Sequence, residues 1–165
     1  MKHEDMKHEE GASSPEILIF AKWALGVPTE IKGDTLWLVE AYRLGLYLSD
    51  LAWDNANRMA RDHRLLDVAD QLRRATRRIS ACIAEGYSRD TGKGRSTYYE
   101  YALGSSREAR DWYHKGRIAM AAVELKHRIS LCTQVIRLTL KMVATERRTN
   151  RRASDGGNFH EDQIP

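Results

Sequence analysis

The sequence lacks the cysteines that cross-link small extracellular proteins, since its 165 residues contain only 2 Cys. Cys82 and Cys132 lie far apart within helix-like stretches, and two such thiols do not make a disulfide framework. No other Cys or His stands at the spacing of metal ligands. We therefore expect two buried thiols in a reducing compartment, with no metal site and no cofactor.

Proline is scarce, with 3 in the chain, and β-branched residues nowhere alternate with polar ones as in a strand. Long hydrophobic runs are also missing: the stretch Ile17–Leu25 is interrupted by Lys22, and about 20 apolar residues are needed to cross a bilayer. The opening repeat MKHEDMKHEE does not resemble a signal peptide, and we expect its His3 and His8 to be spectators. These absences predict a soluble, cytoplasmic protein without a β-sheet.

Positive charge is concentrated in the middle of the chain. The formal net charge is only +4. Between Arg58 and Arg152, however, 22 Lys and Arg stand against 10 Asp and Glu, a net charge of +12. A stretch of this kind attracts polyanions.

Apolar residues recur at steps of three and four, which predicts an antiparallel up-and-down four-helix bundle preceded by a short helix. The short helix begins at Ser14-Pro15-Glu16 and ends at Gly26. The longer helices are expected to begin near Asp34, Arg64, Thr97 and Val123. The predicted organisation is a disordered tail (1–13), an accessory helix with its linker (14–33), the bundle (34–150) and a disordered basic and polar tail (151–165).

Glycines and polar residues mark the expected helix ends. Gly86 is predicted to cap the C-terminus of the second long helix. The segment Ser88–Arg95 is predicted to be a loop, and Thr97 is predicted to open the third helix in a capping box with Glu100. Gly104 falls in the interior of this third helix, where Gly costs about 1 kcal/mol relative to Ala, so we expect a tight packing contact there.

The fourth long helix carries two apolar stripes. One stripe suffices for a bundle core, so the second is predicted to contact another subunit. Trp23 is expected to dock either on the bundle or on a neighbouring subunit. The predicted subunit interface consists of Trp23, Leu131, Val135, Leu138 and Met142.

Two sequence blocks resemble a known family. The first block resembles the signature of the bacterial four helix bundle protein family, and it consists of Gln71-Leu72-Arg73-Arg74-Ala75, then Ile79, then Ile83-Ala84-Glu85-Gly86. Members of that family include proteins encoded in intervening sequences of large-subunit ribosomal RNA genes. The block Ala102-Leu103-Gly104-Ser105, with Glu108, resembles the third-helix motif of that family. The resemblance implies an antiparallel four-helix bundle that assembles into a ring, typically a pentamer.

The chain is more distantly similar to Avd, the accessory subunit of diversity-generating retroelements. That resemblance implies a basic pentamer that associates with a reverse transcriptase and its RNA. Two positions depart from the pattern of the four helix bundle family, since Cys82 replaces the usual Asn and Arg78 replaces the usual Ser. The additional arginine favours a polyanionic partner.

Catalytic motifs are not found in the sequence. It contains no nucleophile elbow, no HExxH and no paired carboxylates, so we expect no enzymatic activity. Glu85 is the one acid that could serve as a buried base, and we expect it to pair with Arg78 or Arg89 instead.

Two functions remain open at this point. The first is association with nucleic acid, most readily RNA, through Lys and Arg side chains that contact phosphates. The second is a protein-interaction scaffold without a nucleic-acid role, which would use the helix with Trp23 and the second stripe of the fourth long helix. The predicted nucleic-acid-binding residues are Arg73, Arg74, Arg77, Arg78, Lys93, Arg95, Arg147, Arg148, Arg151 and Arg152.

Overall fold

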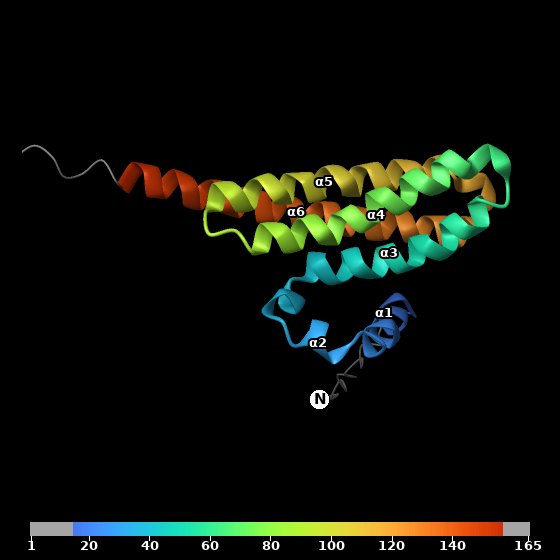
Figure 1. Ribbon diagram of the computed structural model, residues 1–165, viewed down its shortest axis with the longest axis horizontal. Helices are drawn as coiled ribbons and strands as arrows, with labels where there is room; N and C mark the ends of the chain where they lie inside the picture. The colour runs from blue at the N-terminus through green and yellow to red at the C-terminus, as the bar shows by residue number, and fades with distance from the viewer. Residues whose placement is uncertain (1–14, 157–165) are drawn as a thin grey trace, which may run out of the picture.

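A computed structural model describes residues 15–156, with side chains for residues 19–152 (Figure 1). All regular elements in this range are helical, so the predicted all-α class is confirmed. The α-helices are α1 (Pro15–Leu25), α2 (Thr29–Lys32), α3 (Glu40–Met59), α4 (Leu66–Tyr87), α5 (Gly92–Lys115) and α6 (Ala122–Gly156). Short 3₁₀ turns precede three of them, at Thr35–Leu38, His63–Leu65 and Arg117–Ala119. The predicted tail at 1–13, and residues 157–165 of the tail predicted at 151–165, lie outside the described residues.

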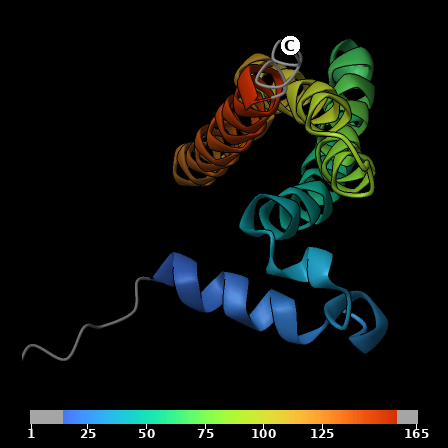
Figure 2. The same ribbon diagram turned by 90° about the vertical axis from the view of Figure 1, so that its left-hand side faces the viewer.

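Helices α3 to α6 form the bundle, and short connections make consecutive helices antiparallel (Figure 1). The end-on view in Figure 2 shows α4 flanked by α3 and α5, with α6 on the other side of α5. Helix α6 also contacts α3, less extensively than it contacts α5. The bundle therefore has two outer helices, α3 and α6, which contact each other less extensively than consecutive helices do.

The core of the bundle is built from the apolar stripes of all four helices. Large and small residues alternate in it: α3 and α4 supply most of the large aliphatic side chains, whereas α5 supplies small ones. Tyr99, Leu103 and Tyr113 are the large exceptions on α5, and Tyr113 is fully buried. The largest fully buried side chains include Tyr47, Leu48, Met59, Leu72, Ile79, Ile83, Tyr113 and Val135.

Gly86 lies inside α4 rather than at its cap, and the predicted role as a C-cap is wrong. The C-cap residue of α4 is Ser88. Gly86 instead faces α5, where an added Cβ would stand 2.7 Å from Cε1 of Tyr99. The glycine thus permits α4 and α5 to approach each other closely.

Helix α5 begins earlier than the sequence suggests. Thr91 is its N-cap, with its hydroxyl accepting a hydrogen bond from the Gly94 amide at 3.1 Å. Half of the predicted loop is therefore the first turn of the helix. Thr97 does not cap it, because its hydroxyl donates to the Lys93 carbonyl at 3.0 Å one turn back.

Gly104 has no packing contact that would explain it. It is exposed on α5, and no atom of a neighbouring element lies within 4 Å of the place where a Cβ would stand. The expectation of a tight contact at this glycine is wrong within the described chain.

Helix α1 docks on α3 through aromatic side chains. Trp23 Nε1 donates to Asp50 Oδ2 at 2.8 Å, and its ring lies 5.1 Å from that of Tyr47 and 6.3 Å from that of Trp37 between centroids. Phe20 packs edge-on against Tyr47. Of the two positions expected for Trp23, the structure has it on its own bundle.

Both apolar stripes of α6 face the interior, which corrects the predicted subunit interface. Leu131 and Val135 are buried in the core, and Leu138 and Met142 are half-buried against it. Two stripes are needed because α6 packs against both α5 and α3. The helix then continues past Thr149 to Gly156, so Arg151 and Arg152 belong to a helix and not to a disordered tail.

Candidate nucleic-acid interface

The four arginines predicted on α4 lie near the middle of that helix and split into two directions. Arg73 and Arg77 lie over the ring of Trp53 on α3, at 5.4 and 5.3 Å from its centroid. Arg78 lies over Tyr101 of α5, at 6.0 Å. This divergence spreads the like charges that the sequence places one helical turn apart.

Carboxylates near these arginines are few. Asp70 pairs with Arg73 at 3.3 Å and with Arg74 at 3.7 Å. Arg73 also donates to Asn57 Oδ1 at 2.8 Å. Among the described side chains, Arg77 and Arg78 have aromatic neighbours but no ion-pair partner. The α4 arginines therefore keep much of their positive charge uncompensated.

The second predicted group combines residues that are far apart in the sequence. The start of α5 lies beside the end of α6, where Arg95 Nε pairs with Glu146 at 3.0 Å and Gly92 lies against Asn150. This packing brings Lys93 and Arg95 to the same end of the bundle as the arginines of α6. Arg147 pairs with Glu100 of α5 at 2.9 Å.

Beyond these two pairs, the end of α6 is basic without compensation. Arg148, Arg151 and Arg152 are exposed, and none of them is paired with a carboxylate among the side chains of residues 19–152. Arg95 is half-buried and held by Glu146, so it is the member of the predicted set with the least freedom to contact a ligand. The helix projects past the other three at this end (Figure 1).

Sequence reasoning missed two further basic residues of this surface. Arg137 and Lys141 are exposed on α6, at three-to-four-residue spacing from Ala144, Arg148 and Arg151. A shallow hollow follows part of this face, lined by Lys141, Ala144, Thr145, Arg147, Arg148 and Arg151. The spacing itself was the available signal, because i, i+4, i+7, i+11 and i+14 lie on one face of a helix. We call Arg137, Lys141, Arg148 and Arg151 the α6 basic stripe.

Arginines at the opposite end of the bundle are engaged in a partly buried network. Glu124 of α6 receives hydrogen bonds from Arg58 and from Asn55 Nδ2, the latter at 2.8 Å, and pairs with Arg128 at 3.3 Å. Burial alone would raise the pKa of Glu124, but the hydrogen bonds and the positive charge of Arg58 outweigh it and lower that pKa. This network has a structural role, because Glu124 compensates the charge of Arg58 and Arg128.

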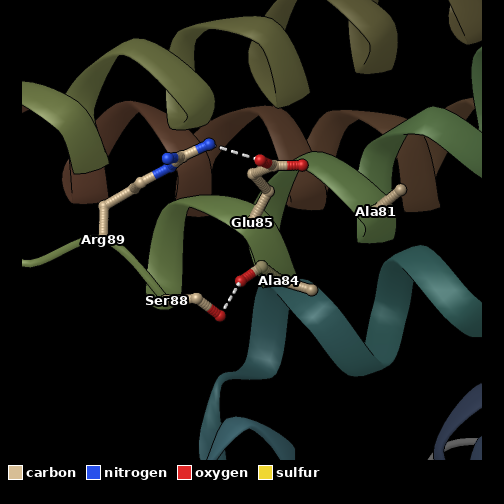
Figure 3. Close-up of a pocket in the computed structure, with 5 residues that line it drawn as sticks. All are labelled: Ala81, Ala84, Glu85, Ser88 and Arg89. Carbon is tan, nitrogen blue, oxygen red and sulfur yellow. Dashed lines mark hydrogen bonds and ion pairs between the residues drawn. The ribbon is translucent and has the colours of Figure 1, made fainter.

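A separate hollow of about 510 Å³ lies near the C-terminus of α4 and is shown in Figure 3. Its lining includes Glu85, Ser88 and Arg89, with Ala81 and Ala84. Glu85 forms an ion pair with Arg89, one of the two partners expected for it. Arg89 also donates to the Tyr98 hydroxyl at 2.7 Å and lies 4.6 Å from the centroid of that ring.

The described residues show no cluster of three or more His, Cys, Asp or Glu that could hold a metal ion. Cys82 and Cys132 are both unpaired and buried. Burial raises the pKa of the Cys132 thiol to about 12, so the reactive thiolate is disfavoured there. No helix in the part of the chain that the structure describes is long and apolar enough to span a membrane.

Comparison with known proteins gives a match to one family model, described as 23S rRNA-intervening sequence protein, over residues 40–141. This range runs from the start of α3 well into α6 and includes most of the bundle. No curated protein and no solved structure matches the chain. The matched range covers more than half of the 165 residues and holds both blocks that carry the resemblance. The chain belongs to the 23S rRNA-intervening sequence protein family.

Proposed function

We propose that this protein is a non-enzymatic, homo-oligomeric accessory protein that binds RNA through the basic end of its bundle. The observation that carries the proposal is the α6 basic stripe, together with Arg152. These side chains are exposed, and none has a carboxylate partner among the side chains of residues 19–152. Uncompensated Lys and Arg on one surface are what phosphate binding requires.

The dimensions of the stripe support this proposal. Arg137 and Arg151 are 14 positions apart, which corresponds to about 21 Å along a helix. Lys93 on α5 lies at the same end, so the positive surface is wider than one helix. A surface of this kind contacts several phosphates without reading base edges, and specificity would come from RNA shape or from a partner.

Oligomerisation is part of the proposal, and a pentameric ring is the state expected from the family resemblance. A ring would repeat the basic surface in each subunit, and several weak phosphate contacts made together give a much higher affinity than one. The free cysteines are consistent with a cytoplasmic location. A reverse transcriptase remains the proposed protein partner of an RNA complex, as the more distant resemblance implies.

The test is fluorescence anisotropy with a structured RNA, a single-stranded DNA and a DNA duplex, each titrated at several salt concentrations. Light scattering on the same sample gives the oligomer mass, which for a pentamer is five times 18.9 kDa. We expect RNA binding whose log affinity falls with log salt by about 0.7 to 0.9 for each phosphate neutralised. Failure to bind RNA even at low salt would reject the proposal.

A matched pair of variants tests which surface of the bundle binds RNA. Replacing Arg147, Arg148, Arg151 and Arg152 by Gln should weaken RNA binding and flatten its salt dependence. The control replaces four exposed basic residues near the opposite end of the bundle by Gln, at Arg61, Lys115, Arg117 and Lys126. The two variants lose the same charge, so equal losses of affinity would mean that only net charge matters.

A protein-interaction scaffold is the second candidate, and one observation favours it. Leu66, Ile118 and Val123 are exposed at the end of the bundle opposite the basic one, Ile118 to 67% and Val123 to 77%. Exposed apolar side chains gathered at one end are typical of a contact with another protein. A protein partner that stays bound after nuclease treatment and high salt would favour this function over RNA binding.

A further inference from the structure

Two exposed aromatic residues and one half-buried one flank α4, and an arginine of α4 or of the turn after it lies over each ring. Trp53 on α3 is 50% exposed and lies under Arg73 and Arg77. Tyr101 on α5 is 48% exposed and lies under Arg78, and the half-buried Tyr98 lies under Arg89. The aromatic rings thus stand on both sides of α4, along most of its length.

These rings do not belong to the core of the bundle. None of the three is among the core residues or the half-buried residues that pack against the core. Tyr98 and Tyr101 contact each other edge to face, with centroids 5.7 Å apart. A cation–π contact at an exposed site contributes only about 0.5–1 kcal/mol. The open parts of these rings are therefore available to a ligand.

The surface between the rings is open and carries more arginines than carboxylates. Arg74 and Ala81 are exposed on α4 between the two sets of rings, where Asp70 pairs with Arg74. The hollow lined by Ala81, Ala84, Glu85, Ser88 and Arg89 lies at one end, and its Glu85 pairs with Arg89. Arg73 and the last residue of α4, Tyr87, are 14 positions apart, about 21 Å along the helix, and Arg89 follows in the next turn. That length accommodates several nucleotides of an extended single strand.

We propose that the outer face of α4 is a binding track for single-stranded RNA, on which Trp53, Tyr98 and Tyr101 stack bases and the neighbouring arginines contact phosphates. Proteins that hold single strands combine these two elements, because every base has a face that can stack. The bases of a duplex are already stacked on one another, so a duplex cannot use the rings. This inference rests on the proposed RNA-binding function. It adds that the RNA is single-stranded and that it contacts a second surface, distinct from the α6 basic stripe.

The experiment compares two fluorescein-labelled probes, an unstructured single-stranded RNA and a blunt RNA duplex of the same length. Trp53→Ala and Tyr101→Ala should each lower affinity for the single strand by about 5- to 150-fold, the range measured for loss of one stacked base. Affinity for the duplex should stay unchanged. Trp53→Phe and Tyr101→Phe keep an aromatic face and should retain most of the single-strand affinity.

The matched control is Tyr87→Ala. Tyr87 is also exposed near the end of α4, but its hydroxyl donates to Thr35 Oγ1 at 3.1 Å and no arginine lies over its ring among the described contacts. Circular dichroism and thermal unfolding check that each variant is folded. Quenching of tryptophan fluorescence by the single strand should also diminish in Trp53→Phe relative to the parent protein.

The outcomes separate this inference from the proposed function. If the parent protein binds both probes and the alanine variants bind the single strand as tightly as the parent, the track is rejected while RNA binding stands. Equal losses for both probes would also reject the track, because stacking should act on the single strand alone. If the parent protein binds neither probe, the proposed function fails and the track with it.

Discussion

Gly86 of α4 lies directly against the ring of Tyr99 on α5, with an imagined Cβ 2.7 Å from Cε1 and 2.9 Å from Cδ1 of the tyrosine. Tyr98 adds to the restriction, because the first carbon of its side chain, Cβ, lies 3.1 Å from the place of the added Cβ. Tyr99 is buried, so its ring has little space into which it could move. The close approach of α4 and α5 at this end of the bundle therefore depends on the absence of a side chain.

We predict that Gly86→Ala destabilises the protein. Overpacking in a core costs about 1–3 kcal/mol, and the better helix propensity of Ala returns at most about 1 kcal/mol. A net loss of about 1–2 kcal/mol is expected, measured by urea unfolding. A variant as stable as the parent would mean that the Tyr99 ring can move aside.

Gly104→Ala should have the opposite effect. Nothing lies within 4 Å of the position of its Cβ, so the substitution adds helix propensity without a steric cost. We expect stabilisation of about 0.5–1 kcal/mol, read from the same urea transitions. If Gly104→Ala instead weakens the oligomer seen by light scattering, the glycine lies at a contact between subunits.

These two glycines illustrate how far the sequence alone can lead. The sequence predicts a C-cap at Gly86 and a tight packing contact at Gly104, but the role of each glycine depends on what lies opposite it in space. Gly86 faces a ring from the next helix, and Gly104 faces solvent in the described chain. Local signals do better where the cause is local: α1 ends at Leu25, directly before Gly26, as the sequence predicts.

The same limit applies to the candidate binding surface. The basic residues could be named from the sequence, and most of them are exposed. The rings of Trp53 and Tyr101 could not be assigned to them, because they come from other helices. Likewise, the sequence predicts Leu131 and Val135 at a subunit interface, whereas the packing of α6 on two neighbours accounts for both stripes.

Trp23→Ala should release α1 from α3 without unfolding the bundle. The substitution removes the hydrogen bond to Asp50 and the ring contacts with Trp37 and Tyr47. Loss of one such hydrogen bond and of the buried ring area weakens docking by about 2–4 kcal/mol. Limited proteolysis should then cleave the linker near Gly26 more rapidly, while the main thermal transition moves little.

The control for this variant is Ile19→Ala, which changes an exposed side chain of the same helix. It should leave the cleavage rate near that of the parent protein. If Trp23→Ala lowers the main unfolding transition by many degrees, α1 is an integral part of the core and not a separable accessory helix.

Glu124→Gln should destabilise the protein in a pH-dependent way. The folded protein holds the pKa of Glu124 below its ordinary value near 4.5, so folding favours the charged form. The contribution is fully present above the unfolded pKa and is lost as the pH falls through the lower, folded pKa. At about pH 7 the variant should lose about 1–3 kcal/mol, the usual range for hydrogen bonds to a charged group.

The decisive measurement for Glu124 is the difference in unfolding free energy between parent and variant at several pH values. This difference should shrink as the pH is lowered below the ordinary glutamate value near 4.5, because the parent then protonates the same carboxylate. Arg58→Gln serves as the matched variant, since Arg58 is one of the groups that lower the pKa of Glu124. A difference that stays constant with pH would show that Glu124 acts through packing, and that its charge contributes nothing to joining α3 and α6.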